Sequence, residues 1–363
     1  MKIQSIQLKY FKRFRELNLD FTDYQTGLAK NLILLIGING AGKTSILQAI
    51  AAALGRATGR LKSPADLTWP GFNYELLASS WGRFNSQVNL QLQFSTSELN
   101  NIAELHQKLT DMGHDLPVAP GASHLVQLHW VGERVDADNA AELFQFKGRQ
   151  YAKQLVRSEG FQVFERVGTV LWYTEQRTAT SLTTEDPDKQ LEITEDILRD
   201  RLFKWQHFHQ DVATGKIKQL RPGQKDVYAE IERIYKQLFP RRSFEGSIPR
   251  ENIDDILSEP WFYLYDGNKQ YEISEMSGGE RAIFPMIVDF VNWNIHNSVI
   301  LIDELELHLH PPMQQALLRV LPKLGKNNQF IITTHSDAVA ALVPNAHIIR
   351  VEEKVEERVA AEV

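Results

Sequence analysis

The sequence contains no cysteine, which excludes disulfide bonds, thiolate metal sites and thiol nucleophiles. It also lacks any apolar run of the roughly 18 residues that a membrane-spanning helix requires. The N-terminal stretch MKIQSIQLKY alternates polar and apolar residues and has no apolar core of a signal peptide. We see no low-complexity tract and no internal repeat. These absences lead us to expect a soluble, cytoplasmic globular protein with no membrane partner.

An excess of basic residues is also missing, because 40 Lys and Arg stand against 46 Asp and Glu, a net charge of −6. This balance excludes a wholly basic nucleic-acid coat but allows a local patch. Residues 216–250 are locally basic, with nine Lys or Arg and four acids. Such a run is compatible with contact with a DNA backbone. The alternative, a solvated helical face, is the more frequent meaning of a charge run.

Hydrophobic periodicity predicts an α/β fold with a mostly parallel core sheet and an antiparallel β subdomain. Short apolar runs such as NLILLI, SVILID and QFIITT are typical of buried parallel strands. A helix is expected from Thr44 to Leu54, with Gly55 as its cap, and a hairpin turning at Asp266 and Gly267. The C-terminal stretch VEEKVEERVAAEV is compatible with a short amphipathic helix. We expect one head, residues 1–363, composed of an N-terminal lobe (1–180), a helical insertion (186–250) and a C-terminal lobe (260–350).

The first motif that carries chemistry is GINGAGKT, residues 37–44, which fits the pattern G-x-x-x-x-G-K-[ST]. Its glycines allow backbone N–H groups to turn inward around a phosphate chain, and the helix that follows offers its positive end to the same anion. Lys43 would reach the β and γ phosphates, and the Thr44 hydroxyl would bind Mg²⁺. The alternative is a glycine-rich turn without a ligand, which the flanking apolar strand and helix disfavour.

The second motif is the pair Asp303 and Glu304 at the end of the apolar run SVILI. A carboxylate at a strand end beside a phosphate loop can hold Mg²⁺, and its neighbour can polarise the attacking water. By itself, the pair is equally compatible with a solvated strand cap. Downstream of a phosphate loop, it indicates Asp303 as a metal contact and Glu304 as a general base.

Two weaker motifs complete the series. In MSGGERA, Ser277 begins a helix whose free N–H groups could bind an anion, although Ser277 and Glu280 also fit a capping box, and both can hold. His335 follows the run QFIITT, where it could donate to a γ-phosphate. A lone histidine is more often structural, so only its position in the order of motifs supports a functional role for His335.

The order of phosphate loop, SGGE, Asp-Glu and Thr-Thr-His resembles that of ATP-binding-cassette (ABC-type) ATPases. The stretches KYFKRF, DELELHLHP and TTHSDAV are similar to the RecF/SMC/OLD-like branch, and especially to short antiphage-type ATPases such as the Septu ATPase subunit. The resemblance covers residues 1–60 and 260–350. The 234 positions between Lys43 and Ser277 are too many for a transporter motor.

The resemblance implies ATP and Mg²⁺ as cofactors and assigns a role to individual residues. Lys43, Glu304 and His335 would be catalytic, while Asp303 and Thr44 would hold the metal. Gln176 would sense Mg²⁺ and the attacking water, although the flanking Glu175 or Arg177 could equally be the functional group. The other cofactor contacts would be Gly37, Asn39, Gly40, Ala41, Gly42, Lys43, Thr44, Ser45, Ser277, Gly278 and Gly279.

Lys12 and Arg13, in the KYFKRF turn, would lie near the base or ribose, or else form a solvated turn. In the family, Ser277, Gly278 and Gly279 touch the nucleotide of the other subunit, so the resemblance implies an ATP-dependent homodimer. No long coiled-coil arm fits between Gln176 and Ser277, and the 28 residues after His335 leave no room for a nuclease domain. A nuclease or toxin would then be a separate chain. The alternative function is a nucleotide-gated scaffold that hydrolyses ATP slowly or not at all.

Overall fold

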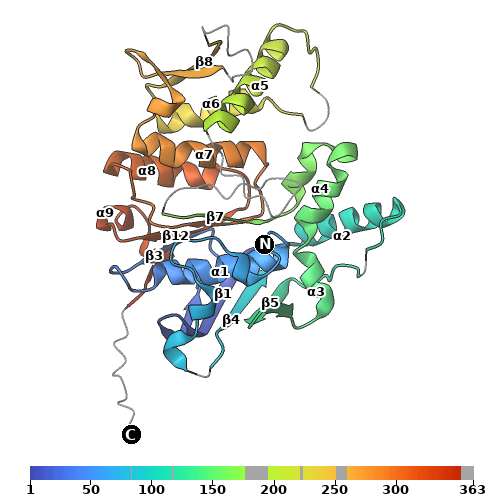
Figure 1. Cartoon of the computed structure of the whole chain (residues 1–363). Coiled ribbons are helices and arrows are strands. Elements are labelled where there is room, and N and C mark those ends of the chain that lie inside the picture. The colour runs from blue at the N-terminus through green and yellow to red at the C-terminus, as the bar shows by residue number, and fades with distance from the viewer. Residues whose placement is uncertain (83, 117, 176–194, 221–223, 251–259, 353–363) are drawn as a thin grey trace.

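The computed structural model describes residues 1–82, 84–116, 118–175, 195–220, 224–250 and 260–352 (Figure 1). A parallel sheet at the centre separates an antiparallel sheet on one side from a helical and β subdomain on the other. The expected α/β class is therefore confirmed. Among the described residues, no helix combines the length and the apolar character needed to cross a membrane.

The central sheet has the strand order β13-β3-β12-β11-β7, and every neighbouring pair is parallel. Its strands are β3 (Leu32–Ile36), β7 (Val170–Tyr173), β11 (Val299–Ile302), β12 (Gln329–Thr334) and β13 (Ile348–Arg350). The apolar runs form central strands because both of their faces are covered. Since strands from both ends of the chain alternate in it, the two expected lobes share a single sheet.

Alternate residues of each central strand enter two separate hydrophobic cores. In β3, Ile33 and Leu35 enter one core, and Leu34 and Ile36 enter the other. Helix α1 (Lys43–Thr58) packs on the first face, whereas α7 (Gly278–Asn292) and α8 (Pro311–Val320) pack on the second (Figure 1). Because successive side chains of a strand point to opposite faces of the sheet, each central strand packs against both the α1 layer and the α7 layer.

Helix α1 continues past its expected end at Gly55. It runs to Thr58, and Gly59, with φ of 75°, caps it by donating to the carbonyls of Arg56 and Gly55. Gly55 lies inside the helix because Leu61 packs against it, so that a Cβ added there would lie 2.7 Å from Leu61 Cδ1. The expectation of a cap at Gly55 is wrong, because this glycine serves close packing.

The antiparallel sheet has the order β2-β1-β4-β5-β6. It contains β1 (Lys2–Phe11), β2 (Phe14–Asp20), β4 (Gln87–Gln93), β5 (Leu125–Val131) and β6 (Arg134–Ala137). The helices beside it are α2 (Thr96–Asp111), α3 (Ala140–Gln145) and α4 (Gly148–Glu159) (Figure 1). Its buried residues, such as Ile6, Leu90 and Leu128, follow the period of two seen in the sequence.

The subdomain beyond α7 contains α5 (Glu195–Ala213), α6 (Val227–Leu238), β8 (Ser243–Ile248), β9 (Trp261–Tyr265) and β10 (Gln270–Glu272). The hairpin predicted at Asp266 and Gly267 joins β9 to β10. The insertion predicted to be helical over 186–250 ends in a strand instead, because Phe244 of β8 packs against Phe262 and Phe284. Helix α9 (Asp337–Ala340) follows β12, and most of the predicted C-terminal helix lies outside the described residues.

A buried glutamine joins the antiparallel sheet to the central sheet. The side chain of Gln329, fully buried at the start of β12, donates to the carbonyls of Ile3 at 2.8 Å and Lys30 at 3.0 Å, and accepts from the N–H of Ile3 at 2.7 Å. These contacts bring β1 and the start of β3 against β12. The junction therefore fixes the start of β12, the strand whose other end leads to His335, to the N-terminal strands.

We predict that Gln329→Leu lowers the free energy of unfolding by about 2–4 kcal/mol, because it leaves buried backbone groups of Ile3 and Lys30 without partners. Denaturant titration of the whole chain measures the change. Gln107→Leu on the exposed face of α2, where the amide bonds only to Asp111, is the matched control and should cost less than about 0.5 kcal/mol. Equal effects of the two substitutions would contradict the role of Gln329.

Candidate functional site

The loop between β3 and α1 has the backbone geometry of an anion cradle. Gly40 and Gly42 adopt left-handed φ values of 82° and 97°. A Cβ on Gly42 would lie 2.4 Å from Phe14 Cζ, so only glycine fits there. The first N–H groups of α1 have no carbonyl one turn earlier to bind, and they therefore face the open end of the loop.

Lys43 holds its ammonium group over this loop. Its Nζ donates to the carbonyls of Gly37 at 2.7 Å and Ile38 at 3.0 Å. Burial lowers the pKa of Lys43, while the nearby carboxylates of Glu304, Glu306 and Asp303 raise it. The ammonium group thus lies between the phosphate loop and a group of acidic side chains. A phosphate oxygen can replace the two carbonyls as its hydrogen-bond acceptor.

Asp303 lies at the point where three elements converge. This carboxylate follows β11 and is almost fully buried, and its Oδ1 accepts from Thr44 Oγ1 at 3.0 Å and Thr333 Oγ1 at 2.5 Å. Thr44 and Asp303 are 259 positions apart in the chain. Hydroxyl and carboxylate oxygens are the hard donors that Mg²⁺ prefers, so this pair fits a magnesium ion.

Glu304 has an unusual backbone for a glutamate. Its φ is 45°, in the left-handed region, and its N–H donates to Thr333 Oγ1 at 2.8 Å. Strained residues of this kind cluster at functional sites. Burial, followed by the charges of Asp303 and Glu306, raises the pKa of Glu304. A carboxylate of raised pKa beside a phosphate loop is suited to accept a proton.

His335 lies at the same end of the sheet, and its partner is a residue that sequence reasoning missed. Glu306 accepts from Thr334 Oγ1 at 2.7 Å and from the backbone N–H of His335 at 2.6 Å, and the Nδ1 of His335 lies 2.8 Å from its Oε1. The only signal in the sequence was a second glutamate in DELELHLH. Nothing in that spacing shows that it faces β12.

Ser277 occupies the start of α7 as the sequence predicts. It accepts from the N–H of Glu280, whose carboxylate accepts in return from the Ser277 N–H at 2.9 Å, so the capping box is present. Gly279 packs against the turn at His308, where an added Cβ would lie 3.3 Å from the His308 carbonyl oxygen. The described contacts of Ser277, Gly278 and Gly279 are with this turn and with Glu280 and Arg281 of the same helix.

Glu280 connects the start of α7 with the inserted subdomain. Its carboxylate, 1% exposed, accepts from Tyr271 OH at 2.5 Å and from Tyr235 OH, and it forms an ion pair with Arg242. These three partners come from β10, from α6 and from the turn before β8. One buried carboxylate therefore ties Ser277 to the subdomain, a link that the capping-box pattern did not reveal.

The structure separates the two basic residues expected near the base or ribose. Lys12 donates to the Gly71 carbonyl at 2.8 Å and to the side chain of Gln48, and burial lowers its pKa to about 8. Arg13 instead runs along the phosphate loop, where a Cβ on Gly42 would lie 2.8 Å from Arg13 Cδ. Of the two, only Arg13 is placed beside the loop.

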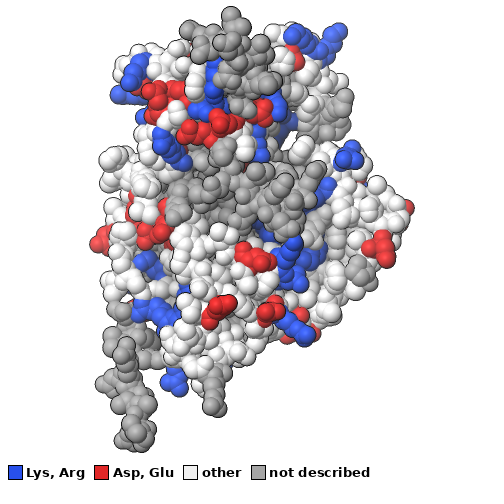
Figure 2. All heavy atoms as spheres, in the orientation of Figure 1, with Lys and Arg blue, Asp and Glu red and all other residues white. Residues whose placement is uncertain are grey.

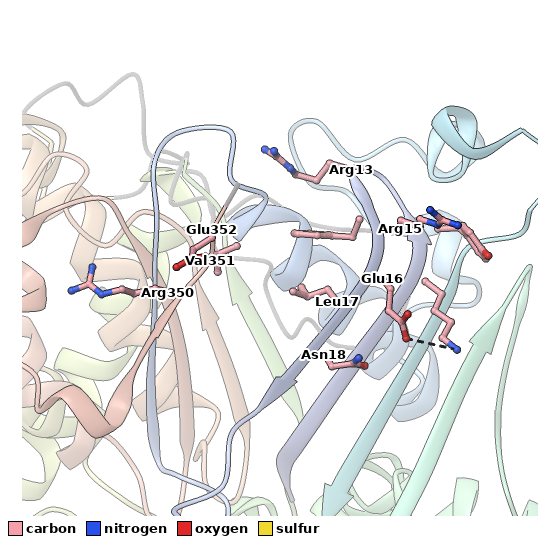
Figure 3. A pocket seen from close by; sticks show the side chains of 11 residues that line it. Arg13, Arg15, Glu16, Leu17, Asn18, Arg350, Val351 and Glu352 are labelled. Atoms are coloured by element: carbon pink, nitrogen blue, oxygen red, sulfur yellow. Dashed lines mark ion pairs between the residues drawn. The ribbon is translucent and has the colours of Figure 1, made fainter. Parts of the chain in front are cut away.

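A cavity of about 750 Å³ opens next to Arg13 (Figure 3). The β1–β2 hairpin forms one wall, with Arg13, Phe14 and Arg15, and residues 350–352 form the other. The second wall adjoins the phosphate loop, because a Cβ on Gly37 would lie 2.4 Å from the Val351 carbonyl oxygen. The cavity thus lies next to the phosphate loop, separated from it by wall residues such as Val351, and is large enough for a nucleoside.

Two further sequence predictions are not decided. Gln176 and Arg177 lie outside the described residues, so the role of Gln176 stays a prediction. The preceding Glu175 lies close enough to Glu304 to contribute to its raised pKa. A DNA contact of residues 216–250 also stays a prediction.

Several basic side chains of the 216–250 stretch have acidic partners within the chain. Ion pairs join Lys216 to Asp211, Arg233 to Glu230, Lys236 to Glu232 and Arg242 to Glu280. On the face shown in Figure 2, basic and acidic groups lie among one another over this subdomain. The arrangement favours the alternative of a solvated, internally paired face.

The chain is similar to AAA-domain family models and to two proteins named as probable ATPases. The family model described as "AAA domain" matches residues 5–238, and a second AAA-domain model, whose description includes "AbiEii toxin, Type IV TA system", matches residues 173–341. The "Retron Ec83 probable ATPase" of Escherichia coli is 24% identical, over 96% of this chain and 71% of that protein. The "Retron Vc95 probable ATPase" of Vibrio cholerae is 19% identical, over 96% of this chain and 73% of that protein.

Other similarities are more limited. "Protein ea59" of Escherichia phage lambda is 36% identical over 100 residues, which are 27% of this chain and 18% of that protein. A solved SMC head bound to the C-winged helix domain of ScpA aligns with a TM-score of 0.47 and 15% identity, over 94% of this chain and 92% of that one. The SMC head domain from Thermotoga maritima aligns with a TM-score of 0.44 and 17% identity, over the same shares.

We predict that the double substitution Tyr235→Phe and Tyr271→Phe lowers the free energy of unfolding by about 2–4 kcal/mol, because each hydroxyl donates to a buried charge. Amide exchange at Gly278 and Gly279 should also become faster, since Glu280 no longer holds the start of α7 as firmly. Tyr263→Phe, at a half-exposed position of the same hairpin, is the control. Unchanged exchange in the double variant would contradict the link.

Proposed function

Because this chain belongs to the AAA domain family and has the parts of an SMC/RecF/OLD-like ABC-type ATPase, we propose that it binds ATP with Mg²⁺ and hydrolyses it. The observation that carries the proposal is the hydrogen bond between Thr44 and Asp303. It brings the phosphate loop and the acidic strand end, far apart in the sequence, within 3.0 Å of each other.

In this proposal, the residues of the site divide the chemistry among them. Lys43 neutralises charge on the β and γ phosphates, and Glu304 accepts the proton of the attacking water. Thr44 and Asp303, together with Gln176, would hold Mg²⁺, which neutralises phosphate charge when bound. His335 donates to the γ-phosphate. The phosphates would lie on the backbone of Gly37, Asn39, Gly40, Ala41, Gly42, Lys43, Thr44 and Ser45.

The cavity beside Arg13 supports a location for the rest of the nucleotide. Its walls combine cationic groups with the ring of Phe14, and it adjoins the loop at Gly37 and Gly42. We expect the ribose and base to occupy it, with Arg13 alongside. Lys12 has no such role in the proposal, because its ammonium group is held by Gln48 and Gly71.

We further propose that two chains form a homodimer around two ATP molecules, each site receiving Ser277, Gly278 and Gly279 from the other chain. Two identical sites follow from a two-fold axis. Ile38, at the tip of the phosphate loop, is 62% exposed although apolar, and a partner chain would cover it. ATP that binds the dimer more tightly than the monomer favours the dimer by mass action.

The similarity to two retron ATPases supports a role in an antiphage defence complex, with a separate nuclease or toxin subunit as partner. The same similarity is compatible with a scaffold that binds ATP without turnover. The complete set of Lys43, Thr44, Asp303, Glu304 and His335 favours hydrolysis over the scaffold.

We predict that Glu304→Gln leaves ATP binding intact but slows hydrolysis by at least ~100-fold, the usual scale for a positioned acid–base group. Release of phosphate by the purified chain with ATP and Mg²⁺ measures turnover, and equilibrium binding of a labelled ATP analogue measures affinity. Glu245→Gln, on the exposed side of β8, is the matched control and should hydrolyse normally. Wild-type turnover by the Glu304 variant would reject the general base.

Mixing two inactive variants tests the shared sites. Lys43→Ala should fail to bind ATP, and Ser277→Arg should fill the space for the partner's γ-phosphate, so neither variant alone should hydrolyse ATP. An equal mixture should recover roughly a quarter of wild-type activity, because half of the dimers are mixed and each contains one complete site. Normal hydrolysis by Ser277→Arg alone would contradict the dimer.

A further inference from the structure

We infer that Glu306 is a positioning residue for His335: its carboxylate holds the imidazole with Nδ1 protonated and leaves Nε2 to face the γ-phosphate. The part of this inference in which Nε2 faces a γ-phosphate rests on the proposed function. The contact itself between Glu306 and His335 is a feature of the fold and stands independently of that function. A carboxylate that holds an imidazole in one tautomer and stabilises its charged form is a recurrent device in catalysis.

Three contacts fix Glu306 against the end of β12. Its Oε2 accepts from Thr334 Oγ1 at 2.7 Å, and its Oε1 accepts from the backbone N–H of His335 at 2.6 Å and faces Nδ1 at 2.8 Å. The Glu306 side chain is 8% exposed, whereas that of His335 is 44% exposed. The ring is therefore held on its Nδ1 side, while much of its surface remains open to a ligand.

The segment that bears Glu306 is itself anchored to β12. The N–H of Leu305 donates to the Thr333 carbonyl at 3.0 Å, and the N–H of Glu304 donates to the Thr333 hydroxyl at 2.8 Å. Beyond it, the N–H of Leu309 donates to the Glu306 carbonyl at 3.0 Å. Glu306 therefore approaches His335 from a backbone already bound to the strand that ends at the histidine.

The chemistry of the two groups determines the proton on the ring. An ionised carboxylate only accepts hydrogen bonds, so the Nδ1 that faces Glu306 must carry the proton. A neutral ring in this tautomer can only accept at Nε2, and it donates to a phosphate oxygen only as imidazolium. Glu306 offsets that positive charge. The Glu306 carboxylate thus lies on the Nδ1 side of the ring, opposite the Nε2 that would face a bound anion.

Glu306 does not compete with Glu304 for the role of general base. Both of its oxygens already accept hydrogen bonds from the residues that end β12, whereas a general base must accept a proton from water. Its effect on hydrolysis would pass through His335. This distinguishes a positioning residue from a catalytic one and defines the readouts that test it.

The first test measures the tautomer without ATP. In the full-length protein labelled with ¹⁵N-histidine, the His335 signals, assigned by their loss in His335→Asn, should show protonated Nδ1. Glu306→Leu removes the acceptor, and the ring should shift towards the Nε2-protonated form that a free imidazole favours. Glu306→Gln retains an acceptor oxygen and should keep the wild-type tautomer. An Nε2-protonated ring in the wild type, or no change in the leucine variant, would overturn the inference.

The second test separates kcat from KM for ATP. Glu306→Leu should lower kcat by about 10–100-fold, the scale for residues that orient a functional group, with KM nearly unchanged. Glu306→Gln should fall between the wild type and the leucine variant, since it keeps the geometry but loses the charge. Adding His335→Ala to Glu306→Leu should cost nothing further, because coupled residues act as a unit. Wild-type kcat in the leucine variant, or losses that multiply, would overturn the inference.

The two tests distinguish a failure of the proposed ATPase function from a failure of the inference about Glu306. A wild-type chain that hydrolyses no ATP would reject the proposed function, and the tautomer measurement alone would then decide the role of Glu306. If Glu306→Leu does not fold, Glu306→Gln still decides. A fall in its kcat with an unchanged tautomer supports the pair, and wild-type kcat in this variant contradicts it. Glu245→Gln, remote on β8, should change neither readout.

Discussion

The candidate site depends on one buried carboxylate, Asp303. Its hydrogen bonds to Thr44 and Thr333 hold together the first turn of α1, the end of β11 and the end of β12. A buried carboxylate must be satisfied by donors, and here the donors are the hydroxyls of Thr44 in α1 and Thr333 in β12. The ends of three elements are thereby fixed relative to one another. These ends in turn position Lys43, Glu304 and His335.

The rest of the architecture keeps these elements in register. Every central strand has one side in the core beneath α1 and the other in the core beneath α7, so a shift of either layer would disturb packing on both faces. Gln329 adds a polar junction between β12 and the N-terminal strands at the opposite end of the sheet. The carboxyl end of the sheet can therefore carry strained and charged residues, such as Glu304, because the remainder of each strand is well packed.

Two further carboxylates, Glu306 and Glu280, fix neighbouring segments to the elements of the site. Glu306 binds the segment after β11 to His335, and Glu280 binds the start of α7 to the subdomain of α6, β8 and the β9–β10 hairpin. In both cases, one side chain joins elements that are distant in the chain, although the sequence predicted only a local capping role for Glu280 and no role for Glu306. A ligand or partner that moves the subdomain would act on Ser277 through Glu280, because this buried carboxylate accepts from Ser277 on one side and is held by Tyr235, Tyr271 and Arg242 on the other.

Local sequence determined much of this protein. The glycines and Lys43 of the phosphate loop, the pair Asp303 and Glu304, and the capping box of Ser277 and Glu280 could be predicted because neighbours in the chain create their chemistry. The period of two likewise predicted the strands of the antiparallel sheet. The end of α1 at Gly59 instead of Gly55 could not be predicted, because the packing of Leu61 against the helix decided it.

Only the tertiary structure decided which distant groups meet. It turned Lys12 towards Gln48 and laid Arg13 along the loop, made residues 243–248 a strand through the packing of Phe244, and placed Glu306 against His335. Each outcome depends on a partner far along the chain, and residue spacing contains no information about such a partner. A hydrogen bond or a packed ring forms only after the sheet has assembled, so these contacts follow from the fold as a whole and not from any local pattern.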